Sequence, residues 1–390
     1  MSVPDPNPMT PGAIAASPER MRRLFDGAED VLPLWIAEPY LGLAPEIETA
    51  LQERAAAGWY GYEVRPETAL GAFWSWMGTR HGWDGAELST TVSPSVGTSI
   101  GVLIDRFTEP GQGVILQPPV FTDFKPLINR AGRTVVRNAL QLTEAGYRMD
   151  LDDLAAKASV PENRLMILCN PHNPVGRVWS TEELSSVARI CAEHDVVVVA
   201  DEIHADLALP GFRFTPFARA AGGSGVAWAA LHGPIKTFGL AGVCDTLLIT
   251  DNTSIADAFR TESSRLHLTR NNVFNIAALE AAYTTDGSWL DGLLEQVAAN
   301  VTLLRNGLPD GIGLIPPEGT YLAWLDFRRL GMDVPELAAW LASSAKLALS
   351  PGHWFGREGA GFARMTIAAP TRWIEEAVAR VGRAVRRRPG

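Results

Sequence analysis

Three short apolar runs constrain the fold of this chain most strongly. They are "GVILQPP" (113–119), "RLMILCNP" (164–171) and "DVVVVADE" (195–202). Runs that are apolar on both faces suit the buried strands of a parallel sheet. Between the last two lies "STEELSSVARICAEHD", in which Ser180 and Glu183 form the capping-box pattern that opens an amphipathic helix. A strand, a helix and a second strand make a right-handed crossover unit, so the sequence predicts a doubly wound α/β fold with a mostly parallel sheet.

The chain is also too long for one ordinary core, because it has 390 residues. After about Tyr283 the pattern changes: the helical segment "GSWLDGLLEQVAANVTLLRNGL" is followed by the alternating "TYLAWLDF" and a helix-rich C-terminus. We therefore predict two domains. The large doubly wound domain would comprise residues 48–283, and a smaller α+β domain would combine residues 1–47 and 284–390.

Composition argues against several classes of function. A formal net charge of −10 disfavours nucleic acid as a partner, because phosphate contacts need a basic surface. No apolar run is long enough to span a membrane, and the proline-rich N-terminus lacks the pattern of a signal peptide. The three cysteines lie in or beside apolar segments without metal-type spacing, which is typical of reduced core residues in a cytoplasmic protein.

One lysine stands out. Lys236 is the only charged residue in "LHGPIKTFGLAG" (231–242), in a chain with four lysines and many more arginines. Burial among such neighbours lowers the pKa of an amine, and a neutral lysine is a nucleophile that forms a Schiff base with a carbonyl. The alternative is a loop lysine whose ammonium group reaches water.

Four further signals have two interpretations each. Asp201 ends the most apolar strand, either as a buried carboxylate or as a turn residue. Asn173 in "NPHNPVG" also fits a turn. The segment Ser95–Thr98 opens a predicted helix, where exposed amides could hold a phosphate. Arg364 lies in the apolar run "GAGFARMTIAAP" and needs a carboxylate, from a ligand or from a structural ion pair.

Together these signals indicate one chemistry. An amine, a strand-end carboxylate, a phosphate cradle and a carboxylate-binding arginine are the groups that hold pyridoxal 5'-phosphate and an amino acid. In such a site the lysine binds the cofactor carbonyl, while the aspartate keeps the pyridine nitrogen protonated so that the ring can draw electrons from Cα.

The chain resembles the fold-type I pyridoxal-phosphate enzymes of the class I/II aminotransferase family, and within them the cystathionine β-lyase-type C–S lyases. The likeness runs from "LPLWIAEP" at Leu32 to "APTRW" at Trp373, through "GWYGYE", "QPPVF", "CNPHNPVGRVW", "ADEIHADL", "KTFGLAG", "PEGTYLAWLDFR" and "LSPGHWFGREGAGFARM". The intervals that separate Asn173, Asp201, Lys236 and Arg364 are 28, 35 and 128 residues, which are usual for the family.

The resemblance implies roles around the cofactor ring. Lys236 would be the Schiff-base lysine and the base that moves the Cα proton. Asp201 would pair with the pyridine nitrogen, and Asn173 would bond the ring hydroxyl and lie close to the substrate. His204 falls where many relatives carry a tyrosine that contacts the same oxygen, and Phe121 would stack on the ring.

It implies further roles at the phosphate and the substrate. Gly97 and Thr98 would present amides or a hydroxyl to the phosphate. Tyr62 would reach the phosphate of a neighbouring subunit, which implies a homodimer with shared sites. Arg364 would clamp the substrate α-carboxylate through two parallel hydrogen bonds.

Several positions depart from the family pattern. Relatives usually carry Ser-x-Ser before the lysine, where this chain has Gly233 and Ile235, so two hydroxyl contacts to phosphate are missing. Gly239 replaces a common asparagine, Phe121 replaces the tyrosine usual in the lyases, and "AEPYL" replaces "ADMDF". These changes bear on cofactor affinity and substrate identity but leave the lysine, aspartate and arginine in place.

We expect β-elimination at an L-cysteine S-conjugate such as cystathionine, which yields a thiol, pyruvate and ammonia. One alternative is an aminotransferase, which uses the same residues. Another is a non-catalytic binding protein that has lost tight phosphate contacts through Gly233 and Ile235.

Overall fold

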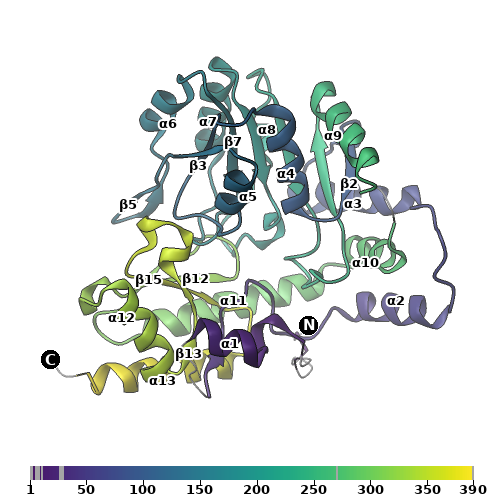
Figure 1. Ribbon diagram of the computed structural model, residues 1–390. Coiled ribbons are helices and arrows are strands. Elements are labelled where there is room, and N and C mark those ends of the chain that lie inside the picture. Colours follow the sequence, from purple (N-terminus) through teal and green to yellow (C-terminus); the bar gives the residue numbers. More distant parts are fainter. Residues whose placement is uncertain (1–2, 5–8, 10–11, 26–29, 269–270, 389–390) are drawn as a thin grey trace.

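The computed structural model describes residues 3–4, 9, 12–25, 30–268 and 271–388. Figure 1 shows a large sheet with its helices in the upper part of the molecule. A smaller sheet lies below it with α11 (Ser288–Gly307), α12 (Val334–Ala339) and α13 (Thr371–Arg386). Both ends of the chain lie in the lower part, so residues far apart in sequence build it together.

The large sheet has seven strands in the order β2-β10-β9-β8-β7-β3-β4. Strands β4, β3, β7, β8 and β9 run parallel to their neighbours in this group, while β10 is antiparallel to both β9 and β2. This confirms the predicted doubly wound, mostly parallel α/β class. The strands are β2 (Ser89–Ser93), β3 (Gly113–Leu116), β4 (Thr134–Arg137), β7 (Asn163–Cys169), β8 (Val197–Asp201), β9 (Trp228–His232) and β10 (Thr246–Thr250).

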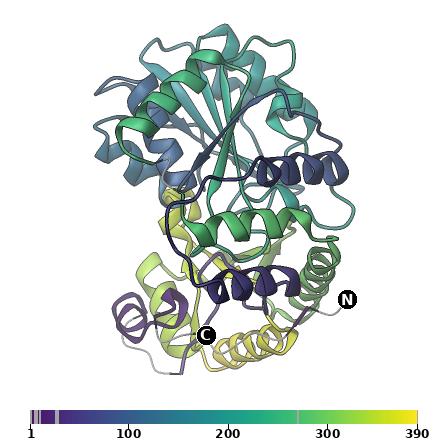
Figure 2. The ribbon, with the colours of Figure 1, turned by 90° about the vertical axis from the view of Figure 1, so that its right-hand side faces the viewer.

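The predicted apolar runs are the central strands, and their successive side chains enter opposite layers. In β7, Leu165 and Ile167 pack in the cluster with α4 (Val96–Phe107), α5 (Phe124–Arg130) and α9 (Thr253–Arg265). Met166 and Leu168 pack in the cluster that contains α7 (Thr181–Glu193). Because helices cover both faces, these strands need apolar residues at every position. Figure 2 shows this layered arrangement from the side.

One helix between residues 45 and 284 begins as the sequence predicts, because α7 opens with the capping box of Ser180 and Glu183. The elements are α2 (Pro45–Ala56), α3 (Glu67–His81), α4 (Val96–Phe107), α5 (Phe124–Arg130), α6 (Leu151–Ala158), α7 (Thr181–Glu193), η2 (Ala205–Leu207), α8 (Phe217–Ala220), α9 (Thr253–Arg265) and α10 (Val273–Thr284), with a small hairpin of β5 (Gln141–Thr143) and β6 (Gly146–Arg148).

The smaller sheet has four antiparallel strands in the order β11-β12-β15-β14, and the N-terminal β1 pairs in parallel with β13. Its strands are β1 (Leu32–Pro33), β11 (Gly313–Ile315), β12 (Leu322–Asp326), β13 (Leu347–Ala348), β14 (Ser350–Pro351) and β15 (Phe362–Thr366). The helical elements are η1 (Ile14–Ala16), α1 (Pro18–Leu24), α11 (Ser288–Gly307), η3 (Arg328–Leu330), α12 (Val334–Ala339), η4 (Trp340–Ser344), η5 (Gly352–Phe355), η6 (Arg357–Gly359) and α13 (Thr371–Arg386).

The pairing of β1 with β13 joins the two chain ends that the sequence assigned to a small domain. The boundary between residues 47 and 48 falls inside α2, and one apolar cluster continues from the large sheet into the smaller one. The predicted boundaries therefore stay a prediction. No helix of the described chain is long and apolar enough to cross a membrane.

Candidate active site

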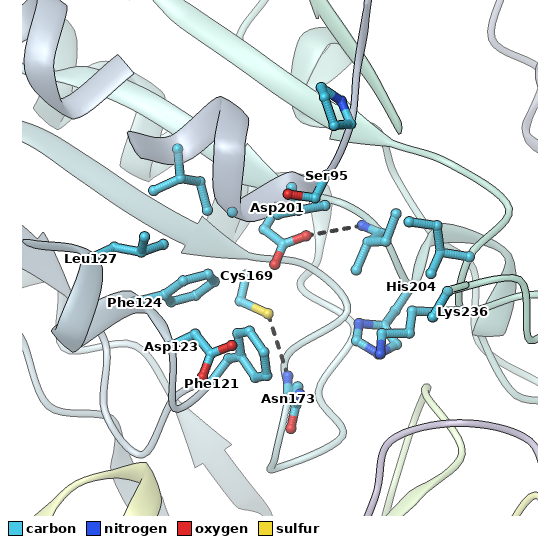
Figure 3. Close-up of a pocket in the computed structure, with 17 residues that line it drawn as sticks. Ser95, Phe121, Asp123, Phe124, Leu127, Cys169, Asn173, Asp201, His204 and Lys236 are labelled. Carbon is cyan, nitrogen blue, oxygen red and sulfur yellow. Dashed lines mark hydrogen bonds between the residues drawn. The ribbon is translucent and has the colours of Figure 1, made fainter. Parts of the chain in front are cut away.

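A cavity of about 300 Å³ lies where β7, β8 and β9 reach their carboxyl ends. This is the edge at which open α/β sheets bind ligands, because the loops there diverge to opposite faces. Figure 3 shows side chains from several loops pointing into it. Its lining includes Ser95, Gly97, Phe121, Asp123, Cys169, Asn173, Asp201, His204, Ile235 and Lys236.

Lys236 follows β9 in a turn and enters this cavity. Its Nζ donates a hydrogen bond of 2.8 Å to the carbonyl oxygen of Ala37. Burial lowers the pKa of the amine to about 8, and the nearby charge of Arg364 acts in the same direction. The uncharged fraction of the amine near neutral pH is therefore larger than that of an ordinary lysine, which favours a role as nucleophile or base.

Asp201 ends β8, and only 4% of it is exposed. Burial raises the pKa of its carboxyl group to about 6, whereas a hydrogen bond from the Ile203 amide to Oδ1, at 3.2 Å, acts in the opposite direction. Asp201 is therefore both the buried carboxylate and the turn residue that the sequence offered as alternatives. One oxygen holds the turn, and the residue also lines the cavity.

Arg364 lies in β15 of the smaller sheet, and only 5% of it is exposed. Its Nη1 donates to Oδ1 of Asn173 at 3.0 Å, and its Nη2 donates to the Trp35 carbonyl at 2.8 Å and to Ser350 Oγ at 3.3 Å. Within the described chain none of these partners is a carboxylate, and Nε has no partner. Burial lowers the pKa of the guanidinium to about 10. A buried guanidinium without a carboxylate partner is able to pair with a carboxylate from a ligand.

His204 is a second buried group with open hydrogen-bonding capacity. It lines the cavity with 3% exposure, and within the described chain neither ring nitrogen has a hydrogen-bond partner. Burial holds the pKa of the imidazole well below its usual range, and the charges of Lys236 and Arg364 lower it further. The ring is therefore neutral and offers one donor and one acceptor to a ligand.

The opposite end of the cavity is formed by the first turn of α4. Gly97 lines the cavity, but Thr98 is not among the lining residues. Ser95 Oγ accepts from the Thr98 amide at 3.0 Å and bonds Thr98 Oγ1 at 2.9 Å, so these two hydroxyls partly satisfy each other. Ile235 brings an apolar side chain to the lining. Lys236 is the only cationic side chain in the lining of this cavity.

The two aromatic residues predicted for the site lie in different places. Phe121 lines the cavity. Tyr62 is 89% exposed and borders a separate surface pocket with Tyr60 and Phe274. The structure therefore brings Phe121 together with the lysine and aspartate within one chain, but not Tyr62.

Three groups at the site were missed by sequence reasoning. The carbonyl of Ala37 that holds Lys236 carries no side-chain signal. Cys169 and Asp123 both line the cavity. The position of Asp123, two residues after Phe121 in "PVFTDF", was the available signal for it.

Known proteins resemble this chain over almost its full length. Residues 46–381 match the family model for aminotransferase class I and II. The chain is 36% identical to cystathionine beta-lyase PatB of Bacillus subtilis, over 92% of this chain and 94% of that protein.

Two solved structures have the same fold. Cystalysin from Treponema denticola, which contains a pyridoxal 5'-phosphate cofactor, superposes with a TM-score of 0.92 at 28% identity, over 99% of both chains. A PLP-bound C–S lyase from Staphylococcus hominis superposes with a TM-score of 0.89 at 25% identity, over 98% of this chain and 97% of that one.

Proposed function

Since the chain belongs to the class I and II aminotransferase family, we propose that it is a pyridoxal 5'-phosphate-dependent C–S β-lyase. Its substrates would be L-cystathionine or related L-cysteine S-conjugates, cleaved to a thiol, pyruvate and ammonia. The observation that carries the proposal is Arg364, a buried guanidinium without a carboxylate partner in the described chain, beside a cavity that holds a partly neutral lysine. A substrate amino acid supplies the missing carboxylate.

The residues present fit the proposed cofactor. The unpaired nitrogens of His204 offer a partner for an oxygen on an aromatic ring, and the Phe121 side chain offers a surface for stacking. The buried carboxylate of Asp201 suits a protonated ring nitrogen, because a cationic partner offsets the burial that raises its pKa. The first turn of α4, with Gly97 in the lining, suits a phosphate.

When bound, the cofactor would supply a carbonyl for the substrate amino group and a ring that withdraws electrons from Cα. Arg364 holds the α-carboxylate, with Asn173 fixing the guanidinium from one side. Lys236 then takes the proton from Cα, which its lowered pKa allows. The electrons of the broken Cα–H bond form a double bond between Cα and Cβ, while the Cβ–S bond breaks and its electron pair leaves on sulfur as the thiolate. Water then hydrolyses the released aminoacrylate to pyruvate and ammonia.

The remaining predicted contacts belong to the same proposal. Asp201 and Asn173 would hold the ring, His204 would bond the ring oxygen and Phe121 would stack on its face. Gly97 would present its amide to the phosphate. Thr98 would contribute its amide or hydroxyl only by giving up bonds to Ser95, which engage both groups.

We also propose a homodimer in which Tyr62 of one subunit completes the site of the other. The support is an exposed group of apolar side chains around it, which includes Trp59 and Val64. Large apolar side chains gathered on a surface are typical of protein interfaces. We place the enzyme in the cytoplasm, where its three free cysteines stay reduced.

Product analysis tests the reaction. The protein, loaded with pyridoxal phosphate, is incubated with S-ethyl-L-cysteine and no 2-oxo acid. A lyase releases ethanethiol and pyruvate in equal amounts over many turnovers. The alternative, an aminotransferase, converts one equivalent per subunit and resumes only when a 2-oxo acid is added. A protein that gains no visible absorbance from the added cofactor would contradict both.

A further inference from the structure

We propose that Asp123 selects L-cysteine S-conjugates whose sulfur substituent carries a positive charge. The inference rests on the proposed lyase function and adds a substrate class to it. It assigns a role to the one carboxylate in the cavity lining that neither the cofactor nor the shared amino-acid part of the substrate uses.

Asp123 stands at the N-cap position of α5, where an aspartate usually accepts hydrogen bonds from the first amides of the helix. Here its side chain makes no such bond. Its carboxylate accepts a hydrogen bond from Thr122 Oγ1 at 3.2 Å, and the residue is exposed at the cavity. The carboxylate is therefore not committed to holding the helix.

Its position relative to the reacting groups favours contact with the substrate. Figure 3 shows Asp123 with Phe121 on one side of the cavity and Lys236 with His204 on the other. The negative charge of Asp123 raises the pKa of Lys236 and that of Arg364, although burial outweighs it at both. Asp123 thus interacts electrostatically with both groups that hold the common part of the substrate, so a substituent on Cβ lies within reach of its field.

The charged groups around Asp123 do not neutralise the negative charge of its carboxylate. Within the described chain Asp123 takes part in no ion pair, and its helix neighbour Lys125 lines a different, smaller pocket. Arg137 in that pocket is paired with Glu358. Glu38, on the segment after β1, adds a second negative charge near Lys236. The substrate side of the cavity is therefore acidic once Arg364 and Lys236 are occupied.

A comparison of three substrates of similar length tests the inference. S-(2-aminoethyl)-L-cysteine, S-ethyl-L-cysteine and S-carboxymethyl-L-cysteine differ in the charge at the end of the substituent. We expect the wild-type enzyme to favour the aminoethyl over the carboxymethyl conjugate by about tenfold in kcat/KM, because a partly exposed carboxylate attracts one and repels the other. In Asp123→Asn the ratio of aminoethyl to ethyl should fall about fivefold and that of carboxymethyl to ethyl should rise.

Dividing each kcat/KM by the value for the ethyl conjugate separates recognition of the substituent from a general effect on Lys236. A general effect would change kcat/KM for all three substrates by the same factor. Asp152→Asn, which removes an exposed aspartate in α6, is the matched control and should leave the ratios as in wild type. Unchanged ratios in Asp123→Asn would overturn the inference while leaving the lyase function intact. If wild type cleaves none of the three conjugates, the lyase proposal itself fails.

Discussion

The two ends of the cavity are built in different ways. At the ring and substrate end, Lys236, Asp201 and Arg364 come from three elements of one chain, and burial shifts the pKa of each. At the phosphate end the chain offers the first turn of α4, a serine already bonded to Thr98, and the apolar Ile235.

The difference concerns what each end contributes. At the first end Lys236, Asp201 and Arg364 are costly to bury as charged groups. A ligand that pairs with them therefore gains the most binding free energy at that end. The second end relies on backbone amides and the helix dipole, which hold an anion without a charged side chain. Changes at the first end should therefore remove chemistry, and changes at the second should mainly alter cofactor affinity.

The largest effect is expected from Lys236→Ala. Loss of the amine removes both the cofactor linkage and the base, so turnover should fall by about 10⁴-fold or more, with loss of the visible absorbance of the bound cofactor. The melting temperature of the cofactor-free protein should not fall, because the change removes a buried amine. Lys157→Ala, at an i,i+4 pair in α6, serves as control. Turnover near the wild-type value would remove Lys236 from the mechanism.

Asp201→Asn tests the electron-withdrawing side of the same end. The amide cannot hold a proton on the ring nitrogen by charge, so we expect kcat to fall by about 100-fold while the cofactor still binds through Lys236. The visible spectrum gives cofactor content, and steady-state kinetics give kcat on the same sample. An unaltered rate at full cofactor content would leave Asp201 only its turn-holding bond to Ile203.

A smaller loss is expected from Arg364→Lys. The ammonium keeps the charge but not the planar pair of donors, which should cost roughly 1.5–3 kcal/mol, or about one to two decades in kcat/KM. The visible spectrum should be nearly unchanged, because no cofactor contact is assigned to this side chain. A purely structural arginine predicts the reverse, with a lower melting temperature and normal kinetics per folded molecule.

The smallest effect is expected at the phosphate end. Ile235→Ser restores one hydroxyl beside the cavity and should bind pyridoxal phosphate about fivefold more tightly than Ile235→Ala, which loses the same apolar atoms without the gain. Titration of the cofactor-free variants gives both affinities. Equal affinities would mean that the hydroxyl does not reach the phosphate.

Gly233→Ser tests the second missing hydroxyl at the phosphate end, where we expect a different result from that of Ile235→Ser. A Cβ there would approach the Asp245 carbonyl oxygen to 3.2 Å and Thr246 Cα to 3.3 Å. Because backbone atoms would have to move, we expect no comparable gain in affinity from a serine at this position. A gain as large as that of Ile235→Ser would show that this backbone yields easily.

Local patterns allowed much of this to be predicted from the sequence. The apolar runs gave the central strands, and the spacing of Ser180 and Glu183 gave the start of α7, because both depend on neighbouring residues alone. The unusual setting of Lys236 was visible for the same reason. The family resemblance then supplied the roles that residue chemistry left open.

Contacts between distant segments could not be predicted. The bond between Arg364 and Asn173 joins residues 191 apart, and the Ala37 carbonyl that receives Lys236 lies 199 residues away. Whether Thr98 offers its hydroxyl to a ligand depends on a bond to Ser95 that only the folded turn fixes. Whether Asp123 caps α5 depends likewise on the orientation of its side chain, which the residue type does not determine.

The central claim is that buried Arg364 binds the carboxylate of the substrate. The most direct test measures kcat/KM for S-ethyl-L-cysteine and for its primary amide, on both the wild type and Arg364→Lys, as a thermodynamic cycle. We predict that the wild type prefers the acid by at least about tenfold and that Arg364→Lys loses most of this preference. Equal preference for the acid in the two proteins would contradict the claim.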